Sequence, residues 1–179
     1  LSRKVCLVTG AGQGLGRSIS LEMAREGAEV VLLERNATSL SSVSAEIEAL
    51  DHKAHPYLLD VTDYARYESI IGEVIAKLGR IDVLVNNAGL ERLTPVEEMD
   101  DAGLAIFRRV IEVNVVGTSI VTACAQAAMP TGAAIINTAS ILGLVGMTRF
   151  PGEPIVPIDY GFGAYSASKG AVVTLTRQF

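Results

Sequence analysis

The sequence predicts an α/β fold, in which a doubly wound parallel sheet carries helices on both faces in three layers. Short apolar runs alternate along the chain with segments of helical pattern. The runs are almost continuously hydrophobic, which is typical of strands buried on both faces of a parallel sheet. A glycine-rich turn joins the first run to the first helical segment. Right-handed connections between parallel strands then give the doubly wound arrangement.

Five β-rich runs and four helical segments make up this pattern. The predicted strands are residues 5–9, 29–33, 54–59, 81–85 and 133–138, and the predicted helices are residues 15–26, 38–50, 63–78 and about 99–129. Gly27 and Gly79 stand where a helix C-terminus needs positive φ, and Asp63 and Asp100 are expected N-caps. We find no repeat, low-complexity tract or linker, and we therefore predict one domain over residues 1–179.

Composition and charge exclude several classes of function. The 179 residues are 49% hydrophobic and 20% charged, which indicates a globular chain. The net charge of -5 gives no reason to expect nucleic acid or an anionic membrane as a partner. No apolar run reaches the ~18 residues of a membrane span, and residues 1–4 lead directly into a strand, so we expect a cytoplasmic protein.

His52 and His55 lack a completing ligand pattern, so we predict no metal site and interpret both as surface loop residues.

The turn Thr9–Gly16 (TGAGQGLG) carries chemistry suited to phosphate. Glycines let the backbone approach a pyrophosphate, and the start of the next helix offers free N–H groups and the positive end of its dipole. The spacing is T-G-x-x-x-G-x-G, which matches neither G-x-G-x-x-G nor a P-loop. A merely flexible turn is the alternative, but the strand before and the helix after disfavour it. The cofactor contacts predicted here are Gly10, Gln13, Gly14, Leu15 and Gly16.

Glu34 closes the second predicted strand, 18 positions after Gly16. An acidic residue at about this distance accepts hydrogen bonds from the adenosine ribose and repels a 2′-phosphate, which favours NAD over NADP. The adjacent Arg35 leaves NADP open, because a guanidinium pairs with such a phosphate. Asp60 and Val61 follow the third strand and are expected near the adenine, although Asp60 is interpreted equally well as a helix cap.

Amide side chains stand at two further positions. The segment Asn86-Asn87-Ala88-Gly89 ends the fourth predicted strand, where polar amides hold either the cofactor or the sheet in place. Asn114 interrupts an apolar helical run, so it is either a satisfied core residue or part of a polar network. We include Asn87, Ala88 and Gly89 among the predicted cofactor contacts and Asn114 among the catalytic candidates.

Tyr165 and Lys169 are four residues apart and share one face of a predicted helix. A neighbouring ammonium favours the phenolate, so such a phenol exchanges protons in carbonyl and alcohol chemistry; the alternative is an exposed aromatic beside a lysine stem. Ser140 follows the fifth predicted strand, where its hydroxyl either binds a substrate carbonyl or belongs to an ordinary loop. Tyr160 has Ala164 rather than lysine four residues on, so Tyr165 is the stronger candidate.

Together these motifs resemble the short-chain dehydrogenase/reductase family over essentially the whole chain. They occur in the family's order: T-G-x-x-x-G-x-G at residues 9–16, N-N-A-G at 86–89, Asn114, Ser140 and Y-x-x-x-K at 165–169. The resemblance implies a Rossmann-type dinucleotide-binding domain. It also implies an NAD(P)(H)-dependent oxidoreductase that interconverts a secondary alcohol and a ketone by hydride transfer, with NAD favoured over NADP.

The resemblance further implies a role for each catalytic candidate. Tyr165 acts as general acid/base on the substrate oxygen, and Lys169 assists it and hydrogen-bonds the nicotinamide ribose. Ser140 polarises and orients the carbonyl, and Asn114 holds a water in a proton relay to Lys169. Family analogy also suggests a homotetramer or homodimer, with interfaces on the predicted 99–129 helix and on the helix of Tyr165.

Two features depart from the family pattern. Ser140 and Tyr165 are 25 positions apart, roughly twice the usual separation, so the Gly- and Pro-rich residues 141–162 are predicted to be a loop insertion without helix or strand that forms part of a substrate lid. The sequence ends at Phe179, within the helix of Tyr165, whereas family members continue for two more strands. We therefore expect a fragment of a longer protein, with the fifth strand as an exposed sheet edge.

A different function remains open at this point. Because the absent C-terminal part normally completes the substrate site, the alternative is a dinucleotide-binding protein without turnover. A purely structural domain is disfavoured, since the polar candidates gather at one predicted edge of the sheet. The residues that choose a substrate belong to the insertion and the absent part, so the sequence predicts neither the substrate nor its stereochemistry.

Overall fold

The computed structural model describes residues 1–94, 99–146 and 161–179. The chain divides into two compact units. The first comprises residues 1–88 and 119–137, and the second comprises residues 89–118 and 138–179. The single domain over residues 1–179 stays a prediction.

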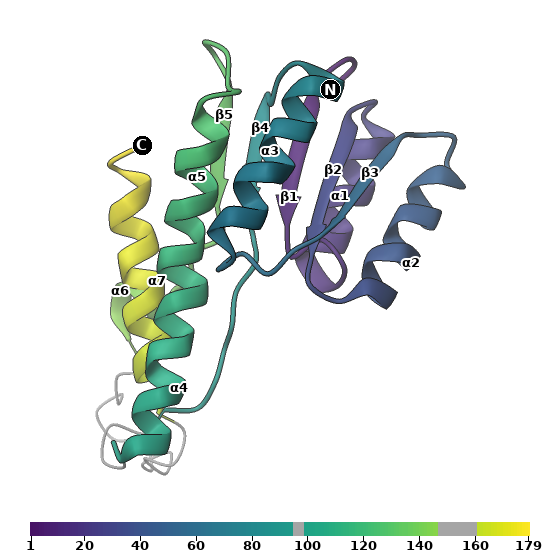
Figure 1. The fold of residues 1–179 in the computed structure, drawn as a ribbon. Coiled ribbons are helices and arrows are strands. Elements are labelled where there is room, and N and C mark those ends of the chain that lie inside the picture. Colours follow the sequence, from purple (N-terminus) through teal and green to yellow (C-terminus); the bar gives the residue numbers. More distant parts are fainter. Residues whose placement is uncertain (95–98, 147–160) are drawn as a thin grey trace. The chain divides into compact units, whose positions relative to one another are not determined.

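The first unit is built on a five-stranded parallel sheet (Figure 1). Its strands are β1 (Val5–Thr9), β2 (Glu29–Glu34), β3 (Ala54–Leu58), β4 (Val83–Asn86) and β5 (Ala134–Asn137), in the order β3-β2-β1-β4-β5. The order reverses between β1 and β4, which makes the carboxyl ends of these two strands a topological switch point. The predicted doubly wound α/β fold is confirmed.

Helices cover this sheet because each presents an apolar stripe to it. The helices of the first unit are α1 (Gly14–Arg25), α2 (Ala37–Glu48), α3 (Tyr64–Leu78) and, from Ser119, α5 (Thr118–Gln126). In Figure 1, α3 lies in front of the strands and α1 behind them. Leu21 of α1 and Val43 and Ile47 of α2 are buried in one cluster with Val8 and Val30 of the sheet. The Asp63 N-cap and the left-handed Gly79 C-cap of α3 form as predicted.

The structure corrects two expectations about the strands. β1 and β2 are buried and β5 is an exposed edge strand, as predicted, but β3 is also an edge strand, with Leu58 50% exposed. An edge strand has a neighbour on one side, so a hydrophobic sequence alone does not ensure burial. The interpretation of His55 as a surface loop residue is wrong: it lies in β3 and is only 7% exposed.

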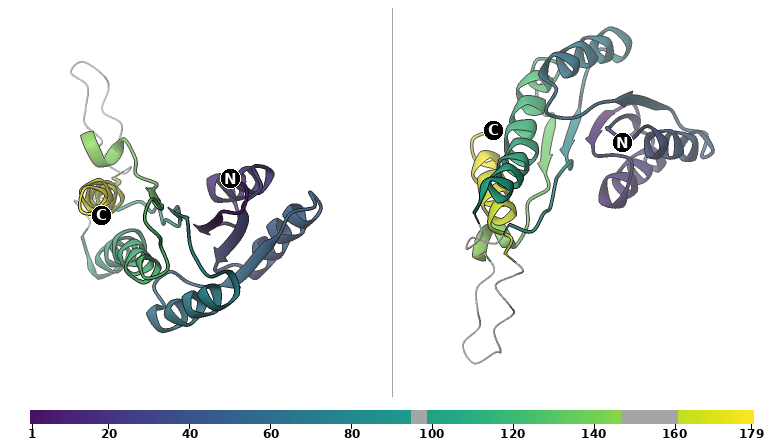
Figure 2. Two further views of the ribbon diagram at one scale, coloured as in Figure 1. Left: turned by 90° about the horizontal axis from the view of Figure 1, so that it is seen from above. Right: turned by 60° about the horizontal axis from the view of Figure 1, so that its bottom comes forward.

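The second unit is helical. It contains α4 (Asp101–Ile111), η2 (Glu112–Gly117), α6 (Leu142–Val145) and α7 (Gly163–Thr176). Figures 1 and 2 show α4 and α6 beside α7, which is drawn in yellow. Asp100 caps α4 by accepting from Gly103 N, as predicted.

Two predictions about these segments need correction. The helix predicted over residues 99–129 is interrupted by η2, a π-helical turn that contains Asn114 and ends at Gly117. π-helical turns are rare and are frequently found at functional sites. The insertion predicted over residues 141–162 contains the short helix α6; its residues 147–160, with Tyr160, lie outside the described residues.

The described part of the chain gives no sign of a membrane span or of a metal centre. None of its helices is long and apolar enough to cross a membrane. Its His, Cys, Asp and Glu side chains form no cluster of three that would hold a metal ion.

Candidate active site

The turn between β1 and α1 brings backbone segments into very close contact. Gly10 has a φ of +62°, and a Cβ there would lie 2.9 Å from Ala88 Cα. A Cβ on Gly16 would collide with the carbonyl oxygen of Gly10 and lie 2.6 Å from Asn87 Nδ2. Glycine at these two positions therefore lets α1 begin directly against the end of β1.

The start of α1 presents free backbone donors. Gln13, the N-cap, has extended backbone and makes no side-chain cap, and no acidic residue occupies the first turn. Gln13, Gly14 and Leu15 are exposed, and Leu15 is 66% exposed. The first N–H groups of a helix lack intrahelical partners and favour an anion. The close-packed glycines and the uncapped helix start fit the pyrophosphate of a dinucleotide.

Glu34 at the end of β2 holds the glycine turn. Its Oε2 accepts from Gly12 N at 3.1 Å, and its Oε1 accepts from Asn36 N at 2.9 Å. The residue is 9% exposed, so these bonds fix the carboxylate at the carboxyl end of the sheet. Each oxygen keeps a further acceptor site. Arg35, the next residue, is exposed.

Asp60 and Val61 follow β3 in a local turn. Asp60 Oδ1 accepts from Thr62 N at 3.0 Å and from Thr62 Oγ1 at 2.8 Å. The alternative interpretation of Asp60 as a helix cap is wrong, because Asp63 caps α3. Val61 is buried.

The asparagines after β4 tie the sheet together at the switch point. Asn87 Nδ2 donates to the carbonyl oxygens of Thr9 and Gly10 at 3.1 and 3.3 Å, and Asn87 N and Ala88 N both donate to Thr9 Oγ1. Asn86 Nδ2 donates to Thr122 Oγ1 and Asn137 Oδ1. The sequence left open whether these amides hold the cofactor or the sheet in place. These bonds are ones in which they hold the sheet.

In the second unit, Asn114 is the centre of a buried polar network. Its Oδ1 accepts from Leu90 N at 2.7 Å, and its Nδ2 donates to Leu90 O at 3.0 Å and to Ser168 Oγ at 2.9 Å. Asn114 is 1% exposed, so the polar-network alternative is confirmed. The network joins η2 to α7 and to the segment that begins at Gly89.

Lys169 follows Tyr165 by one turn of α7. Lys169 is 5% exposed, its Nζ donates to Thr138 O at 2.6 Å, and Nζ lies 5.6 Å from the centre of the Tyr165 ring. Burial lowers the pKa of Lys169, because desolvation disfavours the ammonium. Tyr165 is half-buried, and its carbonyl accepts from Ser168 Oγ at 2.7 Å. The alternative of an exposed aromatic beside a lysine stem is therefore wrong.

Ser140 stands at the start of the segment that leads into α6. It is half-buried, and its Oγ accepts from Leu142 N at 3.2 Å. That bond leaves the hydroxyl proton free to donate to another group. Gly143 of α6 packs on α7 so closely that a Cβ would lie 2.5 Å from the carbonyl carbon of Lys169.

Each unit thus holds one part of the predicted site. The first unit contains the predicted cofactor contacts except Gly89, Tyr165 and Lys169, and the second contains all four catalytic candidates. Sequence reasoning missed several residues that support them: Thr9, Leu90, Thr138, Gly143 and Ser168. Ser168 could have been found from the sequence, since it is a polar residue three positions after Tyr165. The carbonyl contacts of Leu90 and Thr138 could not, because every residue has a carbonyl group.

Known proteins are similar to this chain in sequence and fold. The family model described as short chain dehydrogenase matches residues 4–179. A 3-oxoacyl-(acyl-carrier-protein) reductase of Thermotoga maritima is 36% identical over 99% of this chain and 67% of its own length. A meso-2,3-butanediol dehydrogenase of Serratia marcescens is 38% identical over 97% of this chain and 63% of its own length.

Solved structures agree with these matches. A xylitol dehydrogenase with bound NAD+ superposes with a TM-score of 0.84 at 33% identity, over 99% of this chain and 64% of that one. A blue fluorescent protein from a metagenomic library, in complex with NADPH, gives a TM-score of 0.85 at 31% identity, over 99% of this chain and 68% of that one. The chain spans about two thirds of the length of these relatives. It belongs to the short-chain dehydrogenase family.

Proposed function

We propose that the protein is an NAD(P)(H)-dependent oxidoreductase that interconverts a secondary alcohol and a ketone. The observation that carries this proposal is the buried Lys169, held by Thr138 O with its ammonium 5.6 Å from the centre of the Tyr165 ring. A buried cation is costly and is kept where it has a partner or a task. Relatives named as a butanediol dehydrogenase and a xylitol dehydrogenase support alcohol oxidation as that task.

Tyr165 is the proposed general acid/base. Lys169 Nζ lies 5.6 Å from the centre of the Tyr165 ring, and the burial of Lys169 strengthens the electrostatic interaction between the two side chains because little water screens it. In alcohol oxidation the phenolate takes the hydroxyl proton, and in ketone reduction the phenol returns it to the carbonyl oxygen. The hydroxyl of Ser140 donates a hydrogen bond to the same substrate oxygen and orients it.

Asn114 is proposed to act through position. All the side-chain bonds described for it go to Leu90 and Ser168, so the amide secures the helix that carries Tyr165 and Lys169. Its main-chain carbonyl accepts from Thr118 Oγ1 at 2.9 Å, which holds η2 against the start of α5. We propose that Asn114 also holds the relay water toward Lys169.

The proposed cofactor is NAD, with NADP as the weaker alternative. The dinucleotide, when bound, supplies or accepts the hydride. The glycine turn holds the pyrophosphate, and Glu34 accepts from the adenosine ribose and repels a 2′-phosphate. Arg35 is the residue that opposes this choice. Measured kcat/KM with both cofactors tests it: Glu34→Gln should shift the preference toward NADP, and Arg35→Ala should shift it toward NAD.

Turnover separates an enzyme from a binding protein. We expect the protein to oxidise a secondary alcohol in a substrate screen with either cofactor. Tyr165→Phe should then lower kcat by about 10²- to 10⁴-fold while the dinucleotide still binds. Tyr64→Phe, at a 53% exposed tyrosine in α3, is the matched control and should leave kcat unchanged. Dinucleotide binding without turnover in any screen would support the alternative and contradict the proposal.

The location and the assembly of the protein are further proposals. We propose a cytoplasmic homotetramer or homodimer with interfaces on α7 and on the helices of residues 101–126. Light scattering of the purified protein would test the assembly.

We also propose that residues 141–162 form part of a substrate lid. A variant trimmed within this segment that kept the same substrate range and KM would contradict the lid.

A further inference from the structure

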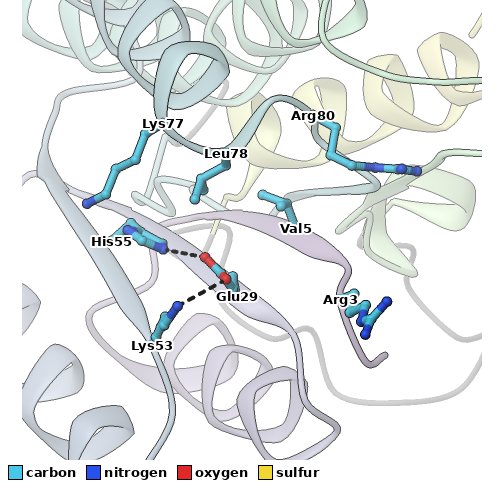
Figure 3. A pocket seen from close by; sticks show the side chains of 8 residues that line it. All are labelled: Arg3, Val5, Glu29, Lys53, His55, Lys77, Leu78 and Arg80. Atoms are coloured by element: carbon cyan, nitrogen blue, oxygen red, sulfur yellow. Dashed lines mark hydrogen bonds and ion pairs between the residues drawn. The ribbon is translucent and has the colours of Figure 1, made fainter.

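A pocket lies in the first unit, at the sheet edge opposite the glycine turn (Figure 3). Its volume is about 560 Å³. Val5, Glu29 and His55 line it from the amino ends of β1, β2 and β3, and Leu78 lines it from the end of α3. Because the strands are parallel, their amino ends share one edge, whereas the glycine turn follows the carboxyl end of β1. The pocket is therefore distinct from the dinucleotide site.

Cations outnumber carboxylates in this pocket. Arg3, Lys53, Lys77 and Arg80 line it together with a single acid, Glu29. Lys53 Nζ lies 3.6 Å from Glu29 Oε1. In the described part of the chain, no carboxylate lies within ion-pair distance of Arg3 or Lys77. The chain as a whole has a net charge of -5, so this edge is a local positive field on an acidic protein.

Two neighbouring features reduce this field without cancelling it. Asp82 forms ion pairs with both Arg80 and Lys4, so its one negative charge is shared between two positive ones. The C-terminal end of α3 carries about half a negative charge from the helix dipole, which the nearby Lys77 offsets. An excess of positive charge remains, and it faces the pocket through Arg3, Lys53 and Lys77.

Glu29 is held among these cations as a fixed acceptor. Its Oε2 lies 3.0 Å from His55 Nε2, and Figure 3 shows the carboxylate between His55 and Lys53. His55 is 7% exposed, and its Nδ1 has no hydrogen-bond partner among the described residues. A carboxylate accepts up to about four hydrogen bonds, so Glu29 retains sites for a ligand hydroxyl.

We propose that this pocket binds a small organic phosphate that also carries hydroxyl groups, such as a sugar phosphate. The cations of Arg3, Lys53 and Lys77 bind the phosphate, and Glu29 accepts from a hydroxyl. Val5 and Leu78 contact the carbon frame. Glu29 also selects the ligand, since its charge repels an anion that offers no hydroxyl donor.

Titration of glucose 6-phosphate, followed by amide NMR shifts, tests the proposal. We expect shifts at Val5, Glu29, His55 and Leu78, with a dissociation constant in roughly the millimolar range or tighter. The double variant Lys53→Ala/Lys77→Ala should weaken binding by about tenfold or more. The control variant Arg66→Ala/Arg92→Ala removes the same charge elsewhere and should bind as the unaltered protein does. Shifts confined to residues 10–16, or equal binding by both variants, would overturn the proposal.

Inorganic phosphate tests the role of Glu29. In Glu29→Gln the repulsion is lost, so inorganic phosphate should bind more tightly, while the preference for glucose 6-phosphate over inorganic phosphate should fall. Gln keeps an oxygen for His55, so the strand should remain folded, which the unchanged NMR spectrum of residues far from the pocket would verify. An unchanged preference would refute the hydroxyl contact to Glu29.

Discussion

The two units hold their parts of the candidate site by different means. In the first unit the site is mainly backbone: the close-packed Gly10 and Gly16, and the N–H groups at the start of α1. In the second unit the site is made of side chains, which a buried hydrogen-bond network around Asn114 and Ser168 keeps in place. Substitutions that add a side chain should therefore disturb the site of the first unit. Substitutions that remove a functional group should disturb the site of the second unit.

The two units also differ in how much apolar surface they bury. The first unit buries apolar residues along β1, β2 and the helices on them. Among the described residues of the second unit, the buried apolar side chains are Val110, Val113, Ala164 and Val172. A small apolar core gives little stability, so buried polar contacts carry more of the order there. Four substitutions test this contrast and follow in decreasing order of the change that each should cause.

The largest effect is expected at Lys169. Lys169→Met removes the ammonium but keeps most of the buried stem, so kcat should fall by about 10²- to 10⁴-fold. The free energy of unfolding should change by no more than about 1 kcal/mol, because the lost bond to Thr138 O is offset by relief from burying a charge. Steady-state kinetics and urea unfolding measure the two. Arg177→Met, at an exposed residue just after α7, should change neither; a large stability loss in Lys169→Met would show a structural lysine instead.

At Gly16, added volume should disturb the backbone site. Gly16→Ala places a methyl against Gly10 O and Asn87 Nδ2, which should cost about 1–3 kcal/mol of unfolding free energy and weaken dinucleotide binding at least about tenfold. Calorimetric titration and denaturant unfolding measure these changes. Gly72→Ala is the control: it lies in α3 with open space around it and should stabilise the protein by about 0.5–1 kcal/mol. Equal behaviour of the two variants would remove the close-packing argument.

Asn114→Asp tests the polar network of the second unit. The new carboxylate replaces the Nδ2 donor and faces the carbonyl of Leu90, so unfolding free energy should fall by about 2 kcal/mol. Asn36→Asp is the matched control, because Asn36 is an exposed N-cap and Asp caps a helix equally well. Chemical denaturation compares the two; a harmless Asn114→Asp would mean that the network is not needed for order.

The smallest effect is expected at Asp82 and depends on pH. Burial alone would raise the pKa of Asp82, but hydrogen bonds from Lys4, Val5 N and Arg80 outweigh it and lower the pKa to about 2. A carboxyl whose pKa is lower in the folded state stabilises the fold above its unfolded pKa, near ~4, and loses this contribution as pH falls toward ~2. Because Lys4 and Arg80 are half-exposed, we expect about 1–2 kcal/mol.

Asp82→Asn should therefore be less stable than the unaltered protein at neutral pH and equally stable near pH ~2. Thermal unfolding at a series of pH values measures the difference. Asp100→Asn, at an exposed N-cap, provides the comparison without an ion pair and should show a small difference at every pH. A constant gap between Asp82→Asn and the unaltered protein across pH would contradict the ion-pair account.

The sequence predicted the elements of this fold that depend on local chemistry. The five parallel strands, the glycine turn and the caps at Asp63, Gly79 and Asp100 follow from hydrophobic pattern, backbone freedom and side-chain hydrogen bonding to nearby N–H groups. Motif order predicted the family, because the spacing of polar residues along the chain is read directly.

Other features depend on which distant segments meet. The burial of His55 depends on β2 lying beside β3, and the exposure of Leu58 depends on β3 being an edge, neither of which a hydrophobic run reveals. Lys169 donates to the carbonyl of Thr138 because α7 packs beside the segment that contains Thr138, which is 31 residues earlier in the chain.

By itself, the sequence determined the fold class, the phosphate-binding turn and the tyrosine–lysine pair, because each arises from residues close together in the chain. Only the tertiary contacts bury Lys169 against Thr138, bind Asn114 to Leu90 and Ser168, and bring four cations and Glu29 into the lining of one pocket. The physical reason is that burial and long-range hydrogen bonds are properties of pairs of segments, and no single segment encodes its neighbour.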